Sequence, residues 1–192
     1  MALILTSGPS TEPVSLAEAK LHLRVDTADD DALISSLILT SRMHVEAALD
    51  LALITQSWSY FIDAWPNDPI TRLPLRPVQS ITAIRHYADS GTYDTIDPQR
   101  YMLDGTSTPA RLVRRYASTF PKPGRAANGI EIAVIAGYGS TSASVPAPIR
   151  HSILLLVAHW YEHREVPDAN TAAARVPSLV SDLLNPYRIA RL

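Results

Sequence analysis

The sequence has no cysteine, only two lysines and no long hydrophobic run. Without cysteine there is no disulfide framework, no thiol nucleophile and no cysteine metal site. No apolar run reaches about 18 residues, so no helix that spans a membrane is expected. The first seven residues, Met1–Ser7, carry no basic group, so no secretory signal is expected either. These absences exclude disulfide scaffolds, thiol enzymes and membrane proteins from the expected classes.

The chain has the size and composition of a globular protein. It is 192 residues long, with 46% hydrophobic and 19% charged residues, which fits one domain or one domain with a sizeable insertion. Fifteen of its 17 basic residues are arginines, which suit bidentate contacts at interfaces and to phosphates. Its 15 prolines cluster in the middle and indicate many short extended segments there.

Charge is distributed unevenly along the chain. Residues 1–70 carry ten acids and three bases, residues 71–130 carry nine bases and four acids, and residues 131–192 are balanced. A chain with an acidic and a basic block can bind copies of itself side by side, or it can present one sign to a nucleic acid. Both possibilities stay open from charge alone.

Two helices are predicted in the N-terminal part. Ser15 and Glu18 have the spacing of a capping box, which predicts a short helix that ends near Leu23. The acids Asp29, Asp30 and Asp31 then open a second helix, where the helix dipole favours negative charge. Apolar residues at helical spacing from 33 to 49 extend this helix to about 20 residues. Helix-start acids are far commoner than metal clusters, so we expect no metal site here.

The region 57–139 has the pattern of short strands. Asp89-Ser90-Gly91 predicts a hairpin turn. Eight prolines separate the segments and predict short edge strands and loops rather than a long central sheet. The expected strands cover residues 58–63, 70–73, 80–87, 92–96, 101–104, 111–113 and 130–136.

A long apolar helix is predicted to begin near Pro148, and a short one to cover residues 178–185 before Pro186 stops it. On a helical wheel, one continuous apolar arc contains Ile149, Ile153, Leu156, Val157 and Trp160. The side opposite the arc contains His151, Ser152, His159 and Glu162, with His163 at the border. We expect this helix to pack in a core or an interface.

The segment His159-Trp160-Tyr161-Glu162-His163 matches the inverted zinc-protease signature. One helical turn places the two histidines about 6 Å apart, close enough to share a metal. Catalytic zinc needs a third protein ligand, and the short remainder of the chain leaves little room for the helix that would supply it. The apolar arc accounts for the segment more simply. We therefore predict the polar edge of a packed helix, with no metal, no cofactor and no catalysis.

The ordered set of motifs resembles the head–tail connector (adaptor) proteins of tailed bacteriophages and of gene transfer agents. The blocks that carry this resemblance are Val14–Asp26 followed by Asp30-Asp31, Leu73–Ile81, Ala136–Gly139, Val145–Glu165 and Leu183–Arg188. In the last long block, Trp-Tyr-Glu and the following arginine are the recurring part of the family motif. The family's Trp-Pro before the final strand is replaced here by Phe120-Pro121.

The resemblance implies a structural virion protein without enzymatic activity. Such connectors form a ring, usually dodecameric, below the portal, join the capsid to the tail and extend the DNA channel. The implied partners are other copies of the chain, the portal protein, a downstream tail or stopper protein and, without sequence specificity, double-stranded DNA. The implied location is the head–tail interface of a virion assembled in the bacterial cytoplasm.

Layout and resemblance together predict an α+β fold. It combines a small helical bundle from the N- and C-terminal helices, an inserted antiparallel β region and an extended C-terminal tail. The expected boundaries are 1–56 and 140–186 for the helices, 57–139 for the β region and 187–192 for the tail. Arg164 is expected to hydrogen-bond helix-end carbonyls or an acid across the bundle. Trp58, Trp65 and Trp160 are expected to anchor core contacts.

Three groups of residues are candidates for interactions. The densest basic cluster is Arg111, Arg114, Arg115, Lys122 and Arg125, which would contact DNA phosphates or a neighbour's acidic face, or simply be solvated. The tail residues Tyr187, Arg188, Ile189, Arg191 and Leu192 would dock on the portal or a neighbour by strand addition, or form a frayed terminus.

The acids Asp29, Asp30 and Asp31 would form an acidic subunit-contact face. Two alternative functions are a nonspecific DNA-binding module and a zinc-dependent hydrolase that uses His159, Glu162 and His163. The first predicts salt-dependent duplex binding by the monomer. The second predicts bound metal and loss of activity when Glu162 is changed.

Overall fold

The computed structural model describes residues 1–115, 119–163 and 177–189. The chain forms two compact units. Residues 1–10 and 55–138 make up the first, which we call the strand unit. Residues 11–54 and 139–192 make up the second, which we call the helical unit. The described residues contain both α-helices and antiparallel sheets, so the predicted α+β class is confirmed.

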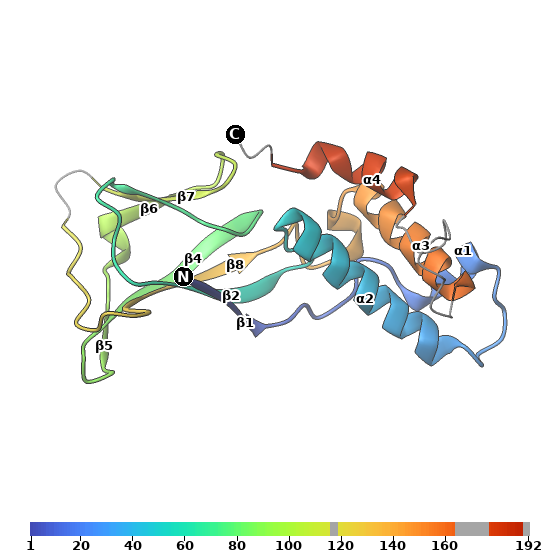
Figure 1. Cartoon of the computed structure of the whole chain (residues 1–192), viewed down its shortest axis with the longest axis horizontal. Coiled ribbons are helices and arrows are strands. Elements are labelled where there is room, and N and C mark those ends of the chain that lie inside the picture. Colours follow the sequence, from blue (N-terminus) through green and yellow to red (C-terminus); the bar gives the residue numbers. More distant parts are fainter. Residues whose placement is uncertain (116–118, 164–176, 190–192) are drawn as a thin grey trace, which may run out of the picture. The chain divides into compact units, whose positions relative to one another are not determined.

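The strand unit contains a five-stranded antiparallel sheet in the order β1-β2-β8-β4-β5 (Figure 1). The strands are β1 (Ala2–Ser7), β2 (Gln56–Ile62), β8 (Ile130–Ala136), β4 (Val78–Tyr87) and β5 (Tyr93–Thr95). The central strand β8 is buried along most of its length and pairs with β2 on one side and β4 on the other. Gly91, with φ of 85°, forms the predicted turn between β4 and β5.

A three-stranded antiparallel sheet in the order β3-β7-β6 completes this unit. Its strands are β3 (Ile70–Arg72), β7 (Arg111–Arg114) and β6 (Tyr101–Asp104), the last preceded by the 3-10 helix η1 (Pro98–Arg100). Residues from both sheets form one hydrophobic core. Its large members include Tyr60, Ile62, Leu73, Ile84, Ile96, Tyr101, Leu112, Phe120, Ile130, Ile132 and Val134. Trp58 and Trp65 pack against this core, as expected for large aromatics.

Two sequence-based predictions for this region were wrong. The first residues, assigned to the helices, form β1, which is ordered by its pairing with β2 far along the chain. The prolines also do not prevent a central sheet, because they fall outside the seven-residue β8 and the ten-residue β4. Two bulges in β4, near Val78 and Ile81, adjust its register to β8.

The helical unit consists of α1 (Leu16–Leu23), α2 (Asp31–Leu49), α3 (Ala147–Glu162) and α4 (Ser178–Leu184). Helix α3 contacts the other three (Figure 1). The buried apolar faces contain Ala19, Ile34, Ile38, Val45, Leu49, Ile149, Ile153, Leu156, Val157, Val180 and Leu184. No helix among the described residues is long and apolar enough to cross a membrane.

The predicted capping box at α1 is confirmed. The Ser15 hydroxyl accepts a hydrogen bond from the Glu18 amide at 3.2 Å, and the Glu18 carboxylate accepts one from the Ser15 amide at 2.9 Å. This amide, followed by the Ser15 hydroxyl and Arg150, holds the pKa of Glu18 below its ordinary value despite partial burial. Arg24, with φ of 58°, ends the helix. The box thus fixes the start of α1 and, through Arg150, joins it to α3.

Helix α3 confirms the predicted apolar arc and corrects one residue. Ile149, Ile153, Leu156 and Val157 are fully buried, while the Trp160 ring meets that of His44 edge to face at 5.8 Å. Ser152, predicted on the polar side, is also fully buried. Its hydroxyl donates to the Pro148 carbonyl at 2.8 Å, so a small polar side chain satisfies itself within the helix. The prediction for Arg164 lies outside the described residues.

Candidate interaction surfaces

The five residues of the predicted basic cluster all lie in the strand unit but do not form one patch. Arg111 pairs with Asp104, with 2.6 Å between Nη2 and Oδ2. Arg115 donates from Nε to the Tyr101 carbonyl at 3.3 Å. The other three, Arg114, Lys122 and Arg125, line one pocket. The cluster therefore divides into three parts: Arg111, which is paired with an acid; Arg115, which lies apart; and the three cations of the pocket.

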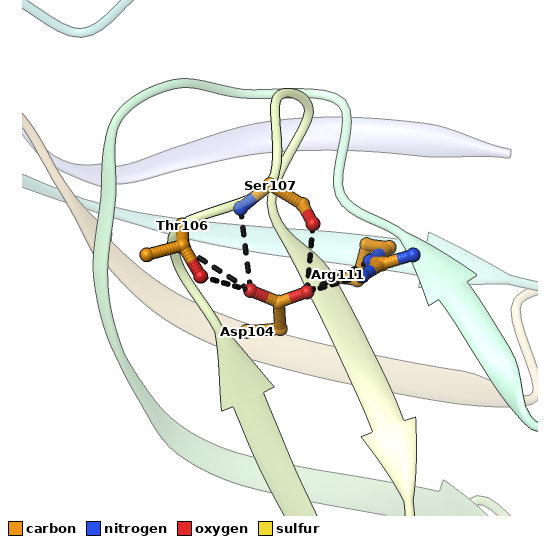
Figure 2. Close-up of polar contacts among 4 residues, drawn as sticks. All are labelled: Asp104, Thr106, Ser107 and Arg111. Carbon is orange, nitrogen blue, oxygen red and sulfur yellow. Dashed lines mark hydrogen bonds and ion pairs between the residues drawn. The ribbon is translucent and has the colours of Figure 1, made fainter.

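Asp104 organises the turn between β6 and β7 (Figure 2). Its carboxylate accepts hydrogen bonds from the hydroxyls of Thr106 and Ser107, both at 2.7 Å, from their amides, both at 3.2 Å, and from the Arg111 guanidinium. Bonds from Thr106, Ser107 and Arg111, in that order, hold the pKa of Asp104 far below its ordinary value. The guanidinium of Arg111 thus helps to fix the turn, and its contact with a phosphate or a neighbour stays a prediction.

The three remaining cations line a pocket of about 500 Å³, which we call the Trp65 pocket. Its lining also includes Asp63, Trp65 and Phe120. The Trp65 and Phe120 rings meet at a centroid distance of 4.7 Å, and Trp65 donates from Nε1 to the Pro121 carbonyl at 3.1 Å. The pocket therefore combines a fixed aromatic wall with positive charge.

Neutral carbonyl groups hold the two pocket arginines in place. Arg114 donates from Nη2 to the carbonyls of residues 66, 67 and 68 at 3.0, 3.3 and 2.6 Å. Arg125 donates from Nε to the Asn128 carbonyl at 2.9 Å and lies 4.0 Å from the centre of the Tyr87 ring. Such partners orient a guanidinium without neutralising it, so the charge of both side chains remains available to a ligand.

A buried carboxylate, Glu131, joins three strands of the large sheet. It accepts hydrogen bonds from the Ser59 hydroxyl at 2.6 Å, the Tyr87 hydroxyl at 2.7 Å and the Arg85 guanidinium at 3.0 Å. Burial raises the pKa of Glu131, but the bonds from Ser59, Tyr87 and Arg85 outweigh burial, so its pKa lies below the ordinary value. All its partners come from neighbouring strands, which makes it a structural group that positions β2, β8 and β4.

The predicted acidic face is partly occupied within its own unit. The Asp31 carboxylate pairs with Lys20, with 2.5 Å between Oδ1 and Nζ, and Asp30 accepts a hydrogen bond from the Tyr161 hydroxyl. Asp30 occupies the N-cap position of α2, but its side chain makes no capping hydrogen bond, so the predicted capping role holds for its position only. Asp29 is exposed. A contact of these acids with another subunit stays a prediction.

The two histidines of the zinc-like motif lie side by side at the end of α3. Their ring centroids are 4.7 Å apart, and His163 Nδ1 is 2.8 Å from the His159 carbonyl oxygen. Within residues 1–115, 119–163 and 177–189, no three histidine, aspartate or glutamate side chains are grouped to hold a metal. The motif has a structural setting as the last turn of a packed helix.

The predicted tail begins inside a helical turn. Tyr187 closes the 3-10 helix Asn185–Tyr187, and Arg188 and Ile189 follow in extended or bent backbone. Arg191 and Leu192 lie outside the described residues. Docking of this tail stays a prediction.

Sequence reasoning missed the roles of Asp63, Asp104 and Phe120. The Asp-Gly-Thr-Ser segment at 104–107 carries a usable signal, because aspartate followed by serine and threonine favours local side-chain to backbone bonds. The convergence of Trp65 and Phe120 carries none, since 55 residues separate them and only the sheet pairing brings them together.

Comparison with known proteins identifies the fold. Residues 13–99 match the family model described as "Phage gp6-like head-tail connector protein". A chain from the neck of an empty gene transfer agent particle, computed with C6 symmetry, has a TM-score of 0.84 and 24% identity over 100% of this chain and 97% of its own. No curated protein sequence matches the chain.

Two further structures agree at 22% identity, with the same coverage of both chains. They are a chain from the virion of a native gene transfer agent particle, with a TM-score of 0.82, and one from the neck of a native particle computed with C12 symmetry, with a TM-score of 0.80. The chain therefore shares the fold of these chains from gene transfer agent particles. The resemblance to the phage head–tail connector family is confirmed over residues 13–99.

Proposed function

We propose that the chain is one subunit of a homo-oligomeric ring, dodecameric as in the family resemblance, at the head–tail interface of a virion. The ring lies below the portal, joins the capsid to the tail and extends the DNA channel. The observation that carries the proposal is the full-length fold match to a chain from a gene transfer agent neck computed with C12 symmetry. The proposed partners are other copies of the chain, the portal protein and a downstream tail or stopper protein.

Charge supports the subunit contact. A ring contact is heterologous, so one surface of each subunit meets a different surface of the next. The helical unit carries 12 acids and eight bases, whereas the strand unit carries nine bases and seven acids. Opposite net charge on the two units favours a contact between the helical unit of one copy and the strand unit of the next. Asp29 and the cations of the Trp65 pocket are the proposed members of these faces.

Contact with DNA in the channel is proposed to be weak and independent of sequence. Scattered arginines and lysines attract phosphates without distinguishing bases, and this attraction falls with salt. Arg115 donates to a neutral carbonyl and keeps its charge for such a contact, whereas Arg111 is paired with Asp104. A free DNA-binding module is the alternative, and it requires the isolated monomer to bind duplex DNA tightly at physiological salt. The channel role requires no chemistry and therefore no catalytic residue.

Complementation of a particle-producing strain tests the proposal. Cells that lack the protein are expected to release capsids without tails, and the wild-type chain is expected to restore tailed, DNA-filled particles. Tailed particles in its absence would contradict the connector role.

Two variants separate the contacts. The double variant Arg114→Glu/Arg115→Glu tests the basic face through ring assembly and DNA retention, with circular dichroism to confirm that it folds. A chain that ends at residue 186 tests the tail, and is expected to fold but not to attach to the portal. Unchanged particle yield and DNA content for the first, or retained attachment for the second, would remove the corresponding residues from the interface.

A further inference from the structure

We propose that the Trp65 pocket binds a short protein segment that carries a carboxylate beside a bulky apolar side chain. Size supports a built site, since about 500 Å³ is within the usual range for pockets that bind ligands. Binding in this pocket does not depend on ring formation, because all of its lining residues belong to a single subunit. In the proposed ring, the segment would come from an adjacent protein chain.

The walls of the pocket favour an apolar side chain. Trp65 and Phe120 meet at 62° with their ring centroids 4.7 Å apart, and the hydrogen bond from Trp65 to the Pro121 carbonyl fixes the indole. Pro66 and Pro123 add rigid apolar surface to the lining. Rigid aromatic and proline walls lose little conformational entropy when they bind a partner.

Its charge favours an anion. Arg114, Lys122 and Arg125 face a single acid in the lining, Asp63. The Asp63 carboxylate already accepts the Asn128 amide at 2.8 Å. Both arginines bond to neutral carbonyl groups, so positive charge remains in excess inside a concave surface. Such concave excess charge attracts and orients a charged group of opposite sign.

A carboxylate fits this site better than a DNA phosphate. Phosphates on a duplex are displayed on a broad convex surface and are contacted by exposed cations. Here the cations sit beside a Trp–Phe wall, and Phe120 is only 9% exposed. A phosphate would leave the aromatic wall unused. A segment such as Glu-Leu-Glu satisfies the cations and the wall together.

A second hollow of about 400 Å³ shares Asp63, Ala64 and Pro66 with the first in its lining. Tyr60 and Ile70 also line this second hollow. An extended segment could place side chains in both hollows, which an isolated anion could not.

Nuclear magnetic resonance on the full chain tests the proposal. The chain has three tryptophans, so its spectrum contains three indole N–H signals, and Trp65→Phe assigns one of them. The probes are the peptide Ac-Glu-Leu-Glu-Leu-Glu-NH2, the same peptide with glutamine at each glutamate, and a 12-base-pair DNA duplex. We expect the acidic peptide to shift the Trp65 signal saturably, and the glutamine peptide to bind at least about tenfold more weakly, because three charges are lost.

A matched pair of variants locates the binding. Lys122→Gln removes a pocket cation and is expected to weaken the peptide about two- to fivefold, whereas Arg115→Gln removes a cation outside the pocket and should leave binding unchanged. An equal loss of peptide affinity in both variants would show general charge attraction and would overturn the proposed binding in the pocket. A Trp65 shift with the duplex alone would assign the site to nucleic acid. No shift with any probe would also refute the proposal, while the ring proposal would stand.

Discussion

Replacing Glu131 by glutamine tests whether the buried carboxylate holds the large sheet together. The substitution keeps the size of the side chain but removes the charge that Ser59, Tyr87 and Arg85 share. The carboxylate is 8% exposed and the Arg85 side chain 31% exposed. The variant therefore changes the chemistry of a nearly buried centre without opening a cavity.

The expected cost follows from those contacts. A hydrogen bond to a charged group contributes about 1.5–3 kcal/mol, and breaking a buried ion pair costs about 3–5 kcal/mol. Arg85 can regain water because it is partly exposed, and glutamine keeps one acceptor for a hydroxyl. We therefore expect the free energy of unfolding of the strand unit to fall by about 2–3 kcal/mol, which lowers the urea midpoint by about 1 M.

Urea unfolding followed by tryptophan fluorescence measures this loss. In a Trp160→Phe background only Trp58 and Trp65 emit, and both lie in the strand unit. Glu162→Gln is the matched control, because Glu162 is exposed at the end of α3. A midpoint for Glu131→Gln that equals that of the control would refute the reasoning.

The same comparison has a defined pH dependence. A lowered pKa in the folded state means that the charged Glu131 stabilises the protein fully above the ordinary glutamate pKa of 4.5. This stabilisation is lost as the pH falls through the lower pKa of the folded state. The difference between wild type and Glu131→Gln is therefore expected to be constant from pH 6 to 8 and to shrink below about pH 4. A stability difference between wild type and Glu131→Gln that grew at acidic pH would contradict a lowered pKa for Glu131.

Two further predictions concern other ion pairs. Asp104→Asn removes the charge that holds the β6–β7 turn. Amide hydrogen exchange at Ser107 is therefore expected to rise at least about tenfold, while exchange in the helical unit is unchanged. The same exchange rate at Ser107 in the variant and the wild type would contradict this role. Arg42→Met in α2 removes the guanidinium that lies 2.6 Å from the Glu46 carboxylate, and the Glu46 side chain is only 12% exposed. The free energy of unfolding is expected to fall by about 2 kcal/mol, as measured by calorimetry. An unchanged melting temperature would show that the ion pair makes no net contribution to stability.

Local signals in the sequence predicted much of the fold. The Ser15–Glu18 capping box, the Gly91 turn and the apolar arc of α3 depend on residues within a few positions of one another, and each is found as expected. Helix and strand periodicity therefore sufficed for most elements. Strand β1 could not be found this way, because it pairs with residues 57–61 of β2, which lie at least 50 positions further along the chain.

The candidate surfaces were only partly predictable. Counting charges found the basic cluster but not its division, because Arg111 and Asp104 are brought together by the pairing of β6 with β7. The same holds for the acids: sequence placed Asp31 at a helix start but could not show that Lys20 neutralises it. Which charges remain available to a partner depends on tertiary contacts.

We have proposed that this chain forms the connecting ring of a virion neck. Cryo-electron microscopy of particles that carry an affinity-tagged copy of the chain tests it most directly. We expect one closed ring of the tagged chain between portal and tail, with its density around the DNA channel. Tagged density elsewhere in the particle, or single copies without a ring, would contradict it.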